Sequence, residues 1–598
     1  MDAVLEKKLD ALLDKARSWT GEEFSVKTMD PVAKLMLAAV LSESQTIKDS
    51  LDGLGERVAD FYLEDFIPRN RVGAIPALAI VEPVFKQQKM AEGAVIESGA
   101  VFTYKIPQAK LPLSYIPVFR TYALPINELY WLAGSGYHAQ DSTRHVNMTK
   151  EKGNVLWLGI NSAAEIVCLK GLSLLFKGTG GISPVKISVG NTGRELSFAS
   201  MDRMSEIEMV EPFDAQQSSE SMFSFLKEWR ETLLDMQEIS LIYLTDPVRD
   251  RDLFKPKPYP SVFQFCLMSE ELDAIKTNTL WLKIEFPDDY HLPEEFEAVV
   301  NAFPVANVDV CQVILTQASP VAKLQKQDDS FFLSVLEASN QARKEGFDLE
   351  RDEYIIRDFD ANCYHDGDLY RDVRNLYHHF VEDYYAFLGY NGIRDGELLK
   401  QLREAFNRIG KSVGSQNEKF KYDSGTYAMK NINHTSKSAA TKVSYLTTKG
   451  RLGNAPRVGD KLENKRHPAL DKDVRVVVSA CCGRDKMTAD ERYEQMRYFT
   501  LTGDRLYTKM DIDAYLRKEI MSEFGEEEFY RIDIKITVQG AGGSEALRRG
   551  VYIDILFKDK KNYNRAQEAS FAVRMQQRIN NKACLSMPVI VKLVNLEG

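Results

Sequence analysis

Residues 474–478 carry valines at alternate positions, and this period of two is typical of a β-strand. The pattern breaks at a glycine, and Thr488 and Glu491 then stand three residues apart, the spacing of a capping box that begins a helix. A second helix is predicted after Thr508, because apolar residues recur at helical spacing through 512–520. This stretch therefore predicts a strand followed by two capped helices.

The rest of the C-terminal part continues the pattern. Apolar residues alternate with polar ones over 530–538 and again over 551–555, a helical spacing follows over 566–577, and a last strand is predicted at 588–594. Counted from residue 474, the order is strand, helices, strand, strand, helix, strand. That order suits a ferredoxin-like β-α-β-β-α-β unit, so we predict such an α/β sandwich over 471–598.

The N-terminal part shows a different periodicity. Residues 1–70 have apolar positions at helical spacing, with Asp30 and Pro31 placed as a cap and first helical residue, and they predict a helical bundle or a docking arm. From about residue 71 to 215 the period shifts to two, in short strands separated by glycine and proline. We expect a β-rich domain there.

The middle of the chain mixes both patterns. Residues 216–345 predict an α+β domain that includes a helix at 218–237, and residues 346–410 predict a helical segment. Residues 411–470 are basic and polar, which favours a long loop with one hairpin. The predicted fold class is thus a multidomain α+β chain with N-terminal helices, central antiparallel β-rich domains and a C-terminal ferredoxin-like sandwich.

Composition narrows the function classes. The chain has 598 residues, 44% of them hydrophobic and 27% charged, which is ordinary for a globular protein of three or four domains. A net charge of −10 argues against general nucleic-acid binding. The N-terminus has no apolar signal core, and no apolar run reaches the ~18 residues of a membrane span, so we expect a cytoplasmic protein without membrane insertion.

The cysteines show no metal-binding or redox spacing. An odd count without a C-x-x-C pattern favours reduced, packed thiols. Adjacent residues of a strand point to opposite faces, so we expect Cys481 and Cys482 not to act as a redox pair. The seven residues are Cys168, Cys266, Cys311, Cys363, Cys481, Cys482 and Cys584.

Two motifs resemble ligand loops and fail on inspection. Gly178, Gly180 and Gly181 suggest a phosphate loop, but no Gly-Lys-Ser/Thr follows and the next residues predict a strand, so a β-turn is favoured. A calcium-loop spacing opens at Asp358, Asp360 and Asn362. The sixth and twelfth positions, which need glycine and glutamate, hold Cys363 and Leu369.

Metal binding near this failed loop is also disfavoured. His365, Asp366 and Asp368 could supply ligands, but Asp368 is better placed as the cap of the following helix. His378 and His379 are neighbours within that predicted helix and point about 100° apart, so they cannot chelate one ion from that helix alone. We therefore predict no metal site and no cofactor.

Catalytic motifs are not found either. The chain has no G-x-S-x-G, H-E-x-x-H or Walker motif, and the carboxylate pairs Asp288-Asp289 and Glu294-Glu295 are expected at the surface. We predict no catalytic residues. Because triads are set by space rather than by sequence order, a hydrolase built around His138, His365 or His378 remains an alternative. A nucleic-acid-binding protein that uses the basic 411–470 region is another.

Several motifs, in the same order along the chain, resemble one family. The C-terminal stretch carries Gly483-Arg484-Asp485, Thr488, Glu491-Arg492, the run from Gly503 to Thr508, Asp511 and Tyr515. With these residues it is similar to baseplate J-like wedge proteins, and specifically to the TssF family of type VI secretion systems.

Weaker matches precede this stretch. They include Pro76, Glu82-Pro83, the run from Ser98 to Phe102, Phe119-Arg120-Thr121, Leu124-Pro125, Leu280-Trp281-Leu282, Phe286, Asn301, Phe303-Pro304-Val305, Asn307, the runs 354–358 and 367–369, the run 382–387, the run 443–446, Thr448, Gly450, Asn454 and Gly459. Over 280–307 the resemblance implies a strand, a helix and then a short P-V-x-N strand.

The resemblance implies a structural role and no catalysis. Such a chain would join one TssG-like subunit, in two copies, to build a wedge of the baseplate of a contractile injection machine. Sheath-initiating TssE-like and connecting TssK-like subunits would bind the wedge, and six wedges would surround a spike hub. The expected location is the cytoplasm, with the baseplate docked at the inner face of the cytoplasmic membrane. The residues that contact each partner cannot be assigned from the sequence.

Overall fold

The computed structural model describes residues 73–213, 239–340, 354–359 and 425–595, with short gaps inside these ranges, and a few positions at 36–40, 226–229 and 400–408. By its internal contacts the chain divides into two units, Met1–Ile67 with Ile356–Tyr427 and Pro68–Ile355 with Ala428–Gly598. The predicted helices of residues 1–70, 218–237 and 346–410 lie almost wholly outside the described residues.

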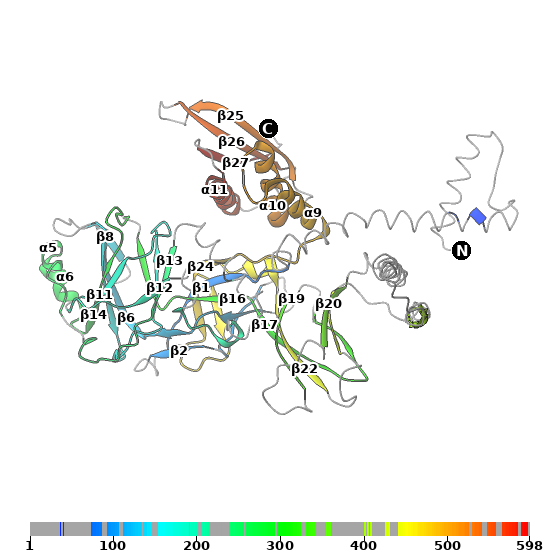
Figure 1. Cartoon of the computed structure of the whole chain (residues 1–598). Helices are drawn as coiled ribbons and strands as arrows, with labels where there is room; N and C mark the ends of the chain where they lie inside the picture. The colour runs from blue at the N-terminus through cyan, green and yellow to red at the C-terminus, as the bar shows by residue number, and fades with distance from the viewer. Residues whose placement is uncertain are drawn as a thin grey trace, which may run out of the picture. The chain divides into compact units, whose positions relative to one another are not determined.

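Six antiparallel strands of the second unit close into a barrel, in the order β1-β16-β4-β3-β23-β24 (Figure 1). Its interior is filled by aromatic and aliphatic side chains from all six strands, among them Phe102, Tyr115 and Phe303, each fully buried. The strands are β1 (Leu78–Glu82), β3 (Phe102–Tyr104), β4 (Leu113–Pro117), β16 (Phe303–Ala306), β23 (Lys461–Asn464) and β24 (Asp473–Cys481).

The barrel strands also bury side chains on their outer face. Ala79 and Val81 of β1 point into the barrel, whereas Leu78 and Ile80 join a second core that includes Phe119, Trp229 and Tyr243. The strand predicted at 474–478 is confirmed as part of β24. It belongs to the barrel, paired with β1 and β23, and Val477 is buried as well as its neighbours.

Two further sheets enclose a core between them. One has the order β12-β13-β10-β15 and the other β11-β14-β9-β6-β7-β8, and leucine, isoleucine and phenylalanine side chains from both sheets meet. The strands are β6 (Ile126–Ala133), β7 (Gly136–Ala139), β8 (Ser142–His145), β9 (Val155–Ser162), β10 (Ser173–Lys177), β11 (Lys186–Val189), β12 (Phe198–Ser200), β13 (Ile239–Leu244), β14 (Thr279–Glu285) and β15 (Glu297–Val300).

Short helices cover the outer face of the larger sheet. Helices α5 (Phe263–Cys266) and α6 (Ser269–Ala274) pack apolar side chains against Trp157 and Trp281 of that sheet. Phe263 lies 4.8 Å from the Trp281 ring, in an edge-to-face arrangement. The sandwich therefore has its larger sheet buried on both sides.

The helix that the resemblance implied between residues 280 and 307 is wrong for the described part of that segment. Residues 297–300 form strand β15, which pairs with β10. The side chains explain the difference, because Ala298 and Val300 enter the sandwich core whereas Val299 enters the neighbouring core. Apolar side chains buried on opposite faces fit a strand between two cores.

Three smaller sheets complete the central region. They have the orders β17-β22-β19, β18-β21-β20 and β2-β5. Their strands are β2 (Ala94–Ile96), β5 (Thr121–Ala123), β17 (Asp309–Leu315), β18 (Val321–Lys323), β19 (Phe331–Asn340), β20 (Tyr354–Phe359), β21 (Gly425–Lys430) and β22 (Thr441–Thr448).

The described part of the basic region 411–470 contains more regular structure than one hairpin. Strand β22 lies between β17 and β19, with Val443, Tyr445 and Leu446 buried, and β23 belongs to the barrel. Polar and basic residues between these strands hide the apolar alternation when composition is averaged over the whole region. The short 3₁₀ helix η6 (Gly450–Asn454) joins β22 to β23.

The C-terminal part contains α9 (Ala489–Thr502), α10 (Lys509–Phe524), β25 (Phe529–Gly540), β26 (Leu547–Phe557), α11 (Arg565–Lys582) and β27 (Val589–Asn595). Its sheet has the order β25-β26-β27, with β26 and β27 parallel. The predicted ferredoxin-like unit is wrong in its first strand, because β24 pairs inside the barrel. Valines at four positions of β24 find buried surroundings on both faces there.

We expect Gly159→Ala to destabilise the sandwich. Gly159 of β9 faces Trp281 of β14, and an added Cβ would lie 2.6 Å from the buried indole ring. Overpacking of this kind costs about 1–3 kcal/mol. Denaturant unfolding followed by tryptophan fluorescence would measure the loss of unfolding free energy. Gly73→Ala, whose Cβ would have no atom within 4 Å, is the control, and equal stability of the two variants would contradict the packing argument.

Candidate functional site

Four segments that are distant in the sequence meet at one end of the barrel. They are the chain before β1, the chain after β16, the helix η6 and the loop that follows β24 at Gly483–Asp485. We call this meeting place the junction, and define it by Ala77, Asn307, residues 448–454 and residues 483–485. It connects the barrel with helices α9 and α10.

Glycines allow the junction backbones to approach closely. A Cβ on Gly483 would lie 2.4 Å from the Gly450 carbonyl oxygen and 2.8 Å from the Ala77 Cβ. Gly450 has φ +52°, and a Cβ there would lie 2.1 Å from an Asp485 carboxylate oxygen. Gly453 is equally confined. Side chains at these positions would separate the segments.

Two asparagines hold the segments together, each through both the oxygen and the nitrogen of its side-chain amide. Asn454 donates from Nδ2 to the Gly483 carbonyl oxygen at 2.9 Å and accepts at Oδ1 from the Gly483 N–H at 2.8 Å. Asn307 is 1% exposed; its Oδ1 accepts from the Lys449 N–H and the Thr448 hydroxyl. Its Nδ2 donates to the Ser114 carbonyl oxygen at 2.9 Å. A buried amide with satisfied donors and acceptors stabilises one arrangement and penalises others.

Arg451 extends the junction to both C-terminal helices. The Asp485 carboxylate accepts from the Arg451 backbone N–H at 2.8 Å, which orients the residue. The Arg451 guanidinium pairs with Glu491 of α9 at 2.9 Å and donates to the Ser522 carbonyl oxygen in the last turn of α10. Carbonyl groups of a last helical turn lack partners within the helix, and a cation placed there is stabilised by the helix dipole.

The predicted caps of both helices are confirmed. Thr488 and Glu491 exchange hydrogen bonds of 2.8 and 3.3 Å at the start of α9, as a capping box requires. Thr508 and Asp511 exchange bonds of 2.8 and 3.2 Å at the start of α10. Glu491 thus serves both the cap of α9 and the ion pair with Arg451.

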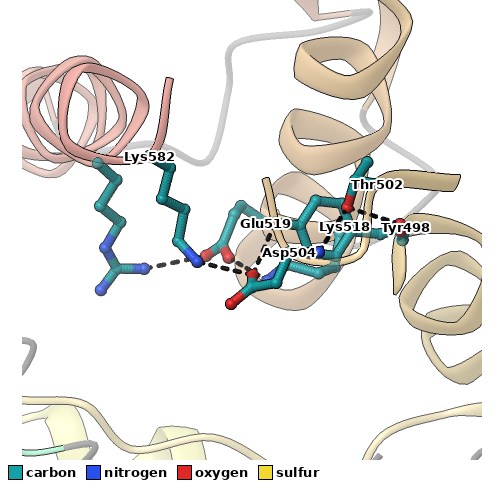
Figure 2. Close-up of polar contacts among 7 residues, drawn as sticks. Tyr498, Thr502, Asp504, Lys518, Glu519 and Lys582 are labelled. Carbon is teal, nitrogen blue, oxygen red and sulfur yellow. Dashed lines mark hydrogen bonds and ion pairs between the residues drawn. The ribbon is translucent and has the colours of Figure 1, made fainter. Parts of the chain in front are cut away.

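A largely buried charge cluster lies between α9, α10 and α11 (Figure 2). Glu519 accepts from Lys518 at 2.7 Å and from Arg578 at 3.1 Å, with the three side chains 15–21% exposed. Asp504, which follows the left-handed cap Gly503, accepts from Lys582 and from the Tyr498 hydroxyl at 2.7 and 2.8 Å. This cluster, defined by these six residues, ties α11 to α9 and α10.

The cluster shifts the pKa values of its members. Burial acts to raise the pKa of Glu519, but the Lys518 and Arg578 cations overcome it and lower that pKa to about 2. Burial lowers the pKa of Lys518, partly offset by Glu519. The Lys518 ammonium also lies 4.8 Å from the Tyr498 ring, a cation–π contact that favours the charged form.

An open cavity of about 640 Å³ lies beside the end of β13 and is lined by both cations and carboxylates. Arg120, from the F-R-T motif, pairs with Glu97 and Glu208, and Lys170 pairs with the same Glu208 at 2.5 Å. Cys168 and Thr245 are also among the described residues that line it. Paired charges of this kind suit binding of a polar partner surface.

The structure describes some of the other residues that the sequence analysis considered as candidates. His138 stacks on Trp131 with ring centroids 3.6 Å apart, and Asp288 and Asp289 are exposed in a loop. Gly178, Gly180 and Gly181 form a turn before β11, with φ between +62° and +77°, as predicted. His365, Asp366, Asp368, His378, His379 and the failed calcium loop lie almost wholly outside the described residues.

The described part of the chain also bears on metal binding and membrane crossing. No group of three or more histidine, cysteine, aspartate or glutamate side chains gathers there as a metal site would require. None of its helices has the length and apolar character that a bilayer crossing demands.

The sequence analysis did not predict that the four segments of the junction meet. Each motif of the junction was visible in the resemblance, but nothing in their spacing showed that Asn307 bonds to Thr448 or that Asn454 bonds to Gly483. The signal that could have found them is the residue types themselves, since glycines and asparagines between buried strands indicate close backbone approach.

Comparisons with known proteins give matches among solved structures. No protein-family model matches the chain, and neither does any curated sequence. Among solved structures, one chain of the type VI secretion system TssK-TssF-TssG baseplate subcomplex, determined by cryo-electron microscopy, is similar with 11% identity and a TM-score of 0.41. The similarity covers 94% of this chain and 96% of that one. Likeness of this degree does not define the fold or function.

Substitution of Gly483 by alanine should open the junction. The new methyl group would meet backbone at 2.4 Å, and backbone cannot turn away as a flexible side chain can. We expect a loss of about 1–3 kcal/mol, with faster amide hydrogen exchange in residues 450–454 and 483–485. Gly73→Ala, whose added Cβ would have no atom within 4 Å and whose backbone is not in the left-handed region, should leave exchange in these segments unchanged. Unaltered exchange in Gly483→Ala would refute the close-packing account.

Acid should weaken the charge cluster in a defined range. The folded pKa of Glu519, about 2, lies below its ordinary value of 4.5, so its contribution is complete above pH 4.5 and is lost as pH falls toward 2. The contribution is up to about 3 kcal/mol. Amide exchange in 512–520, corrected for the intrinsic rate at each pH, would report it. Glu519→Gln should abolish the dependence that this carboxyl causes, and the same acid dependence in both proteins would exclude Glu519 as its source.

Proposed function

We propose that this chain is a structural subunit of the baseplate wedge of a type VI secretion machine and performs no catalysis. The observation that carries the proposal is the junction. Among the residues that resemble TssF, Thr448 bonds to Asn307 and Asn454 bonds to Gly483, while Asp485 and Glu491 both bond to Arg451. Residues that bond to one another in this way serve the architecture of the chain.

The construction of the junction suits a part that bears load. Its contacts combine backbone approach at glycines, paired amide bonds and a charge-assisted bond from Arg451 to Glu491. Packed elements with satisfied polar groups transmit displacement because they have few alternative arrangements. A subunit that passes a conformational signal between partners needs such a rigid connection between its barrel and its helices.

The C-terminal helices offer a surface for a partner. Leu501 of α9 and Met510 of α10 are 52% and 70% exposed, and they line an open groove of about 230 Å³ with Ile532 and Ile534 of β25. Exposed apolar side chains gathered in a groove are typical of protein interfaces. We assign this groove to the TssG-like subunit, since subunits of a permanent complex cover apolar surface that a free chain would expose.

The remaining partners follow from the same proposal. A second copy of the chain would complete the wedge, TssE-like and TssK-like subunits would bind it, and the wedges would surround a spike hub. The location would be the cytoplasm, with the baseplate docked at the inner face of the cytoplasmic membrane. The net charge of −10 is consistent with protein rather than nucleic-acid partners.

Co-expression with the TssG-like product of a neighbouring gene tests the proposal. We expect a heteromeric complex on size-exclusion chromatography, and we expect Met510→Asp to weaken it at least about tenfold because a carboxylate would be buried in the groove. Val458→Asp, at a site 61% exposed away from the groove, is the matched control. A stable monomer that joins no partner would overturn the proposal. Salt-sensitive retention on DNA would instead favour the nucleic-acid alternative.

A further inference from the structure

Cys481 and Cys482 lie at the start of the junction and do not point to opposite faces. The expectation that they diverge assumed that both belong to a strand, but β24 ends at Cys481. Cys482 has φ +70°, in the left-handed region that non-glycine residues seldom adopt. This turn of the backbone brings the two Sγ atoms to 3.2 Å from each other. The expectation that these two side chains point to opposite faces is therefore wrong.

The surroundings of the pair favour thiol chemistry. Both residues are partly exposed, although the Cys481 thiol itself is largely enclosed. The Cys482 thiol and the Arg574 guanidinium lower the pKa of Cys481 against the opposing effect of burial. A thiolate, rather than a thiol, is the reactive nucleophile, so a larger thiolate fraction makes Cys481 the residue that reacts first.

Two of the other described cysteines, Cys168 and Cys311, have an oxygen atom near their sulfur. The Cys168 Sγ lies 4.0 Å from the Asp246 carbonyl oxygen, and the Cys311 Sγ lies 3.7 Å from the Thr447 hydroxyl. Cys311 is also buried. Oxygen neighbours cannot resolve an oxidised sulfur into a disulfide, so these two residues serve as internal comparisons.

We propose that Cys481 and Cys482 form a dithiol modification site, which a peroxide oxidises to a disulfide between neighbouring residues and which a trivalent arsenical chelates. The inference goes beyond the structural role above and does not depend on it. It rests on the sulfur–sulfur distance, the left-handed Cys482 backbone and the partial exposure of both residues.

The oxidation balances in two steps. The Cys481 thiolate attacks one oxygen of hydrogen peroxide, the O–O bond breaks, and after proton transfer a sulfenic acid and one water are formed. The Cys482 sulfur then attacks the Cys481 sulfur, the S–S bond forms and the S–O bond breaks, releasing a second water. Two thiols are oxidised by two electrons and the peroxide is reduced. Proximity makes the second step intramolecular and therefore fast.

The purified full-length chain, treated with hydrogen peroxide and then digested, tests the proposal by mass spectrometry. We expect the peptide that holds both residues to lose about 2 Da and to resist iodoacetamide until it is reduced, as an internal disulfide does. This change should occur about tenfold faster than modification of Cys168, because Cys481 has a resolving thiol at 3.2 Å whereas the Cys168 sulfur lies beside a carbonyl oxygen. Cys168→Ser should oxidise at the pair as the unmodified chain does.

Single variants separate a pair from two independent thiols. In Cys482→Ser the Cys481 sulfenic acid has no resolving thiol, so it should persist and be trapped by dimedone. Phenylarsine oxide gives a second readout, which uses the unmodified chain and needs no oxidant. It should bind the pair one to one, forming two As–S bonds with loss of one water. The proposal is overturned if both cysteines stay open to alkylation after peroxide treatment, or if the arsenical binds no better than to Cys481→Ser.

Discussion

The close approach of backbone at Gly450, Gly453 and Gly483 is the constraint on which this structure depends. A side chain at any of the three would occupy space already taken by a carbonyl oxygen, a carboxylate or the Ala77 methyl group. Because the approach is so close, Asn454 can reach both the N–H and the carbonyl of Gly483. Arg451 can likewise reach from η6 to α9 and α10. The barrel and the C-terminal helices are therefore joined by short contacts rather than by a linker.

Buried polar groups add specificity to this connection. Leaving the buried Asn307 amide without hydrogen-bond partners would cost about 1–3 kcal/mol of stability. Any other arrangement of the four segments is therefore penalised. The charge cluster acts in the same way among α9, α10 and α11. Removing the Glu519 carboxylate from water is costly, and this cost is offset because Lys518 and Arg578 both pair with it. Such groups contribute little net stability but exclude alternatives, which suits a part that must keep its shape.

Local signals in the sequence predicted local structure well. The valine alternation of β24, the capping boxes at Thr488 and Thr508, and the turn at Gly178–Gly181 each depend on neighbours within a few residues. The misses share a different cause. Residues 297–300 lie between two cores, β22 lies at the centre of a sheet, and β24 pairs with a strand almost 400 residues earlier. The junction could not be predicted because it depends on those long-range pairings, although its glycines and asparagines were visible.

The adjacency of the cysteine pair to the junction follows from the same constraint. Strand β24 must end where Gly483 enters the close contact, and the chain must turn to bring the glycine beneath the Gly450 carbonyl. The residue before that glycine takes the left-handed turn, and a cysteine there lies beside the last residue of the strand. Adjacent side chains point to opposite faces inside a strand, but this rule fails where the strand ends. The geometry that makes Cys481 and Cys482 neighbours is thus a consequence of how the barrel meets its helices, and any change that loosens Gly483 should also separate the two sulfurs.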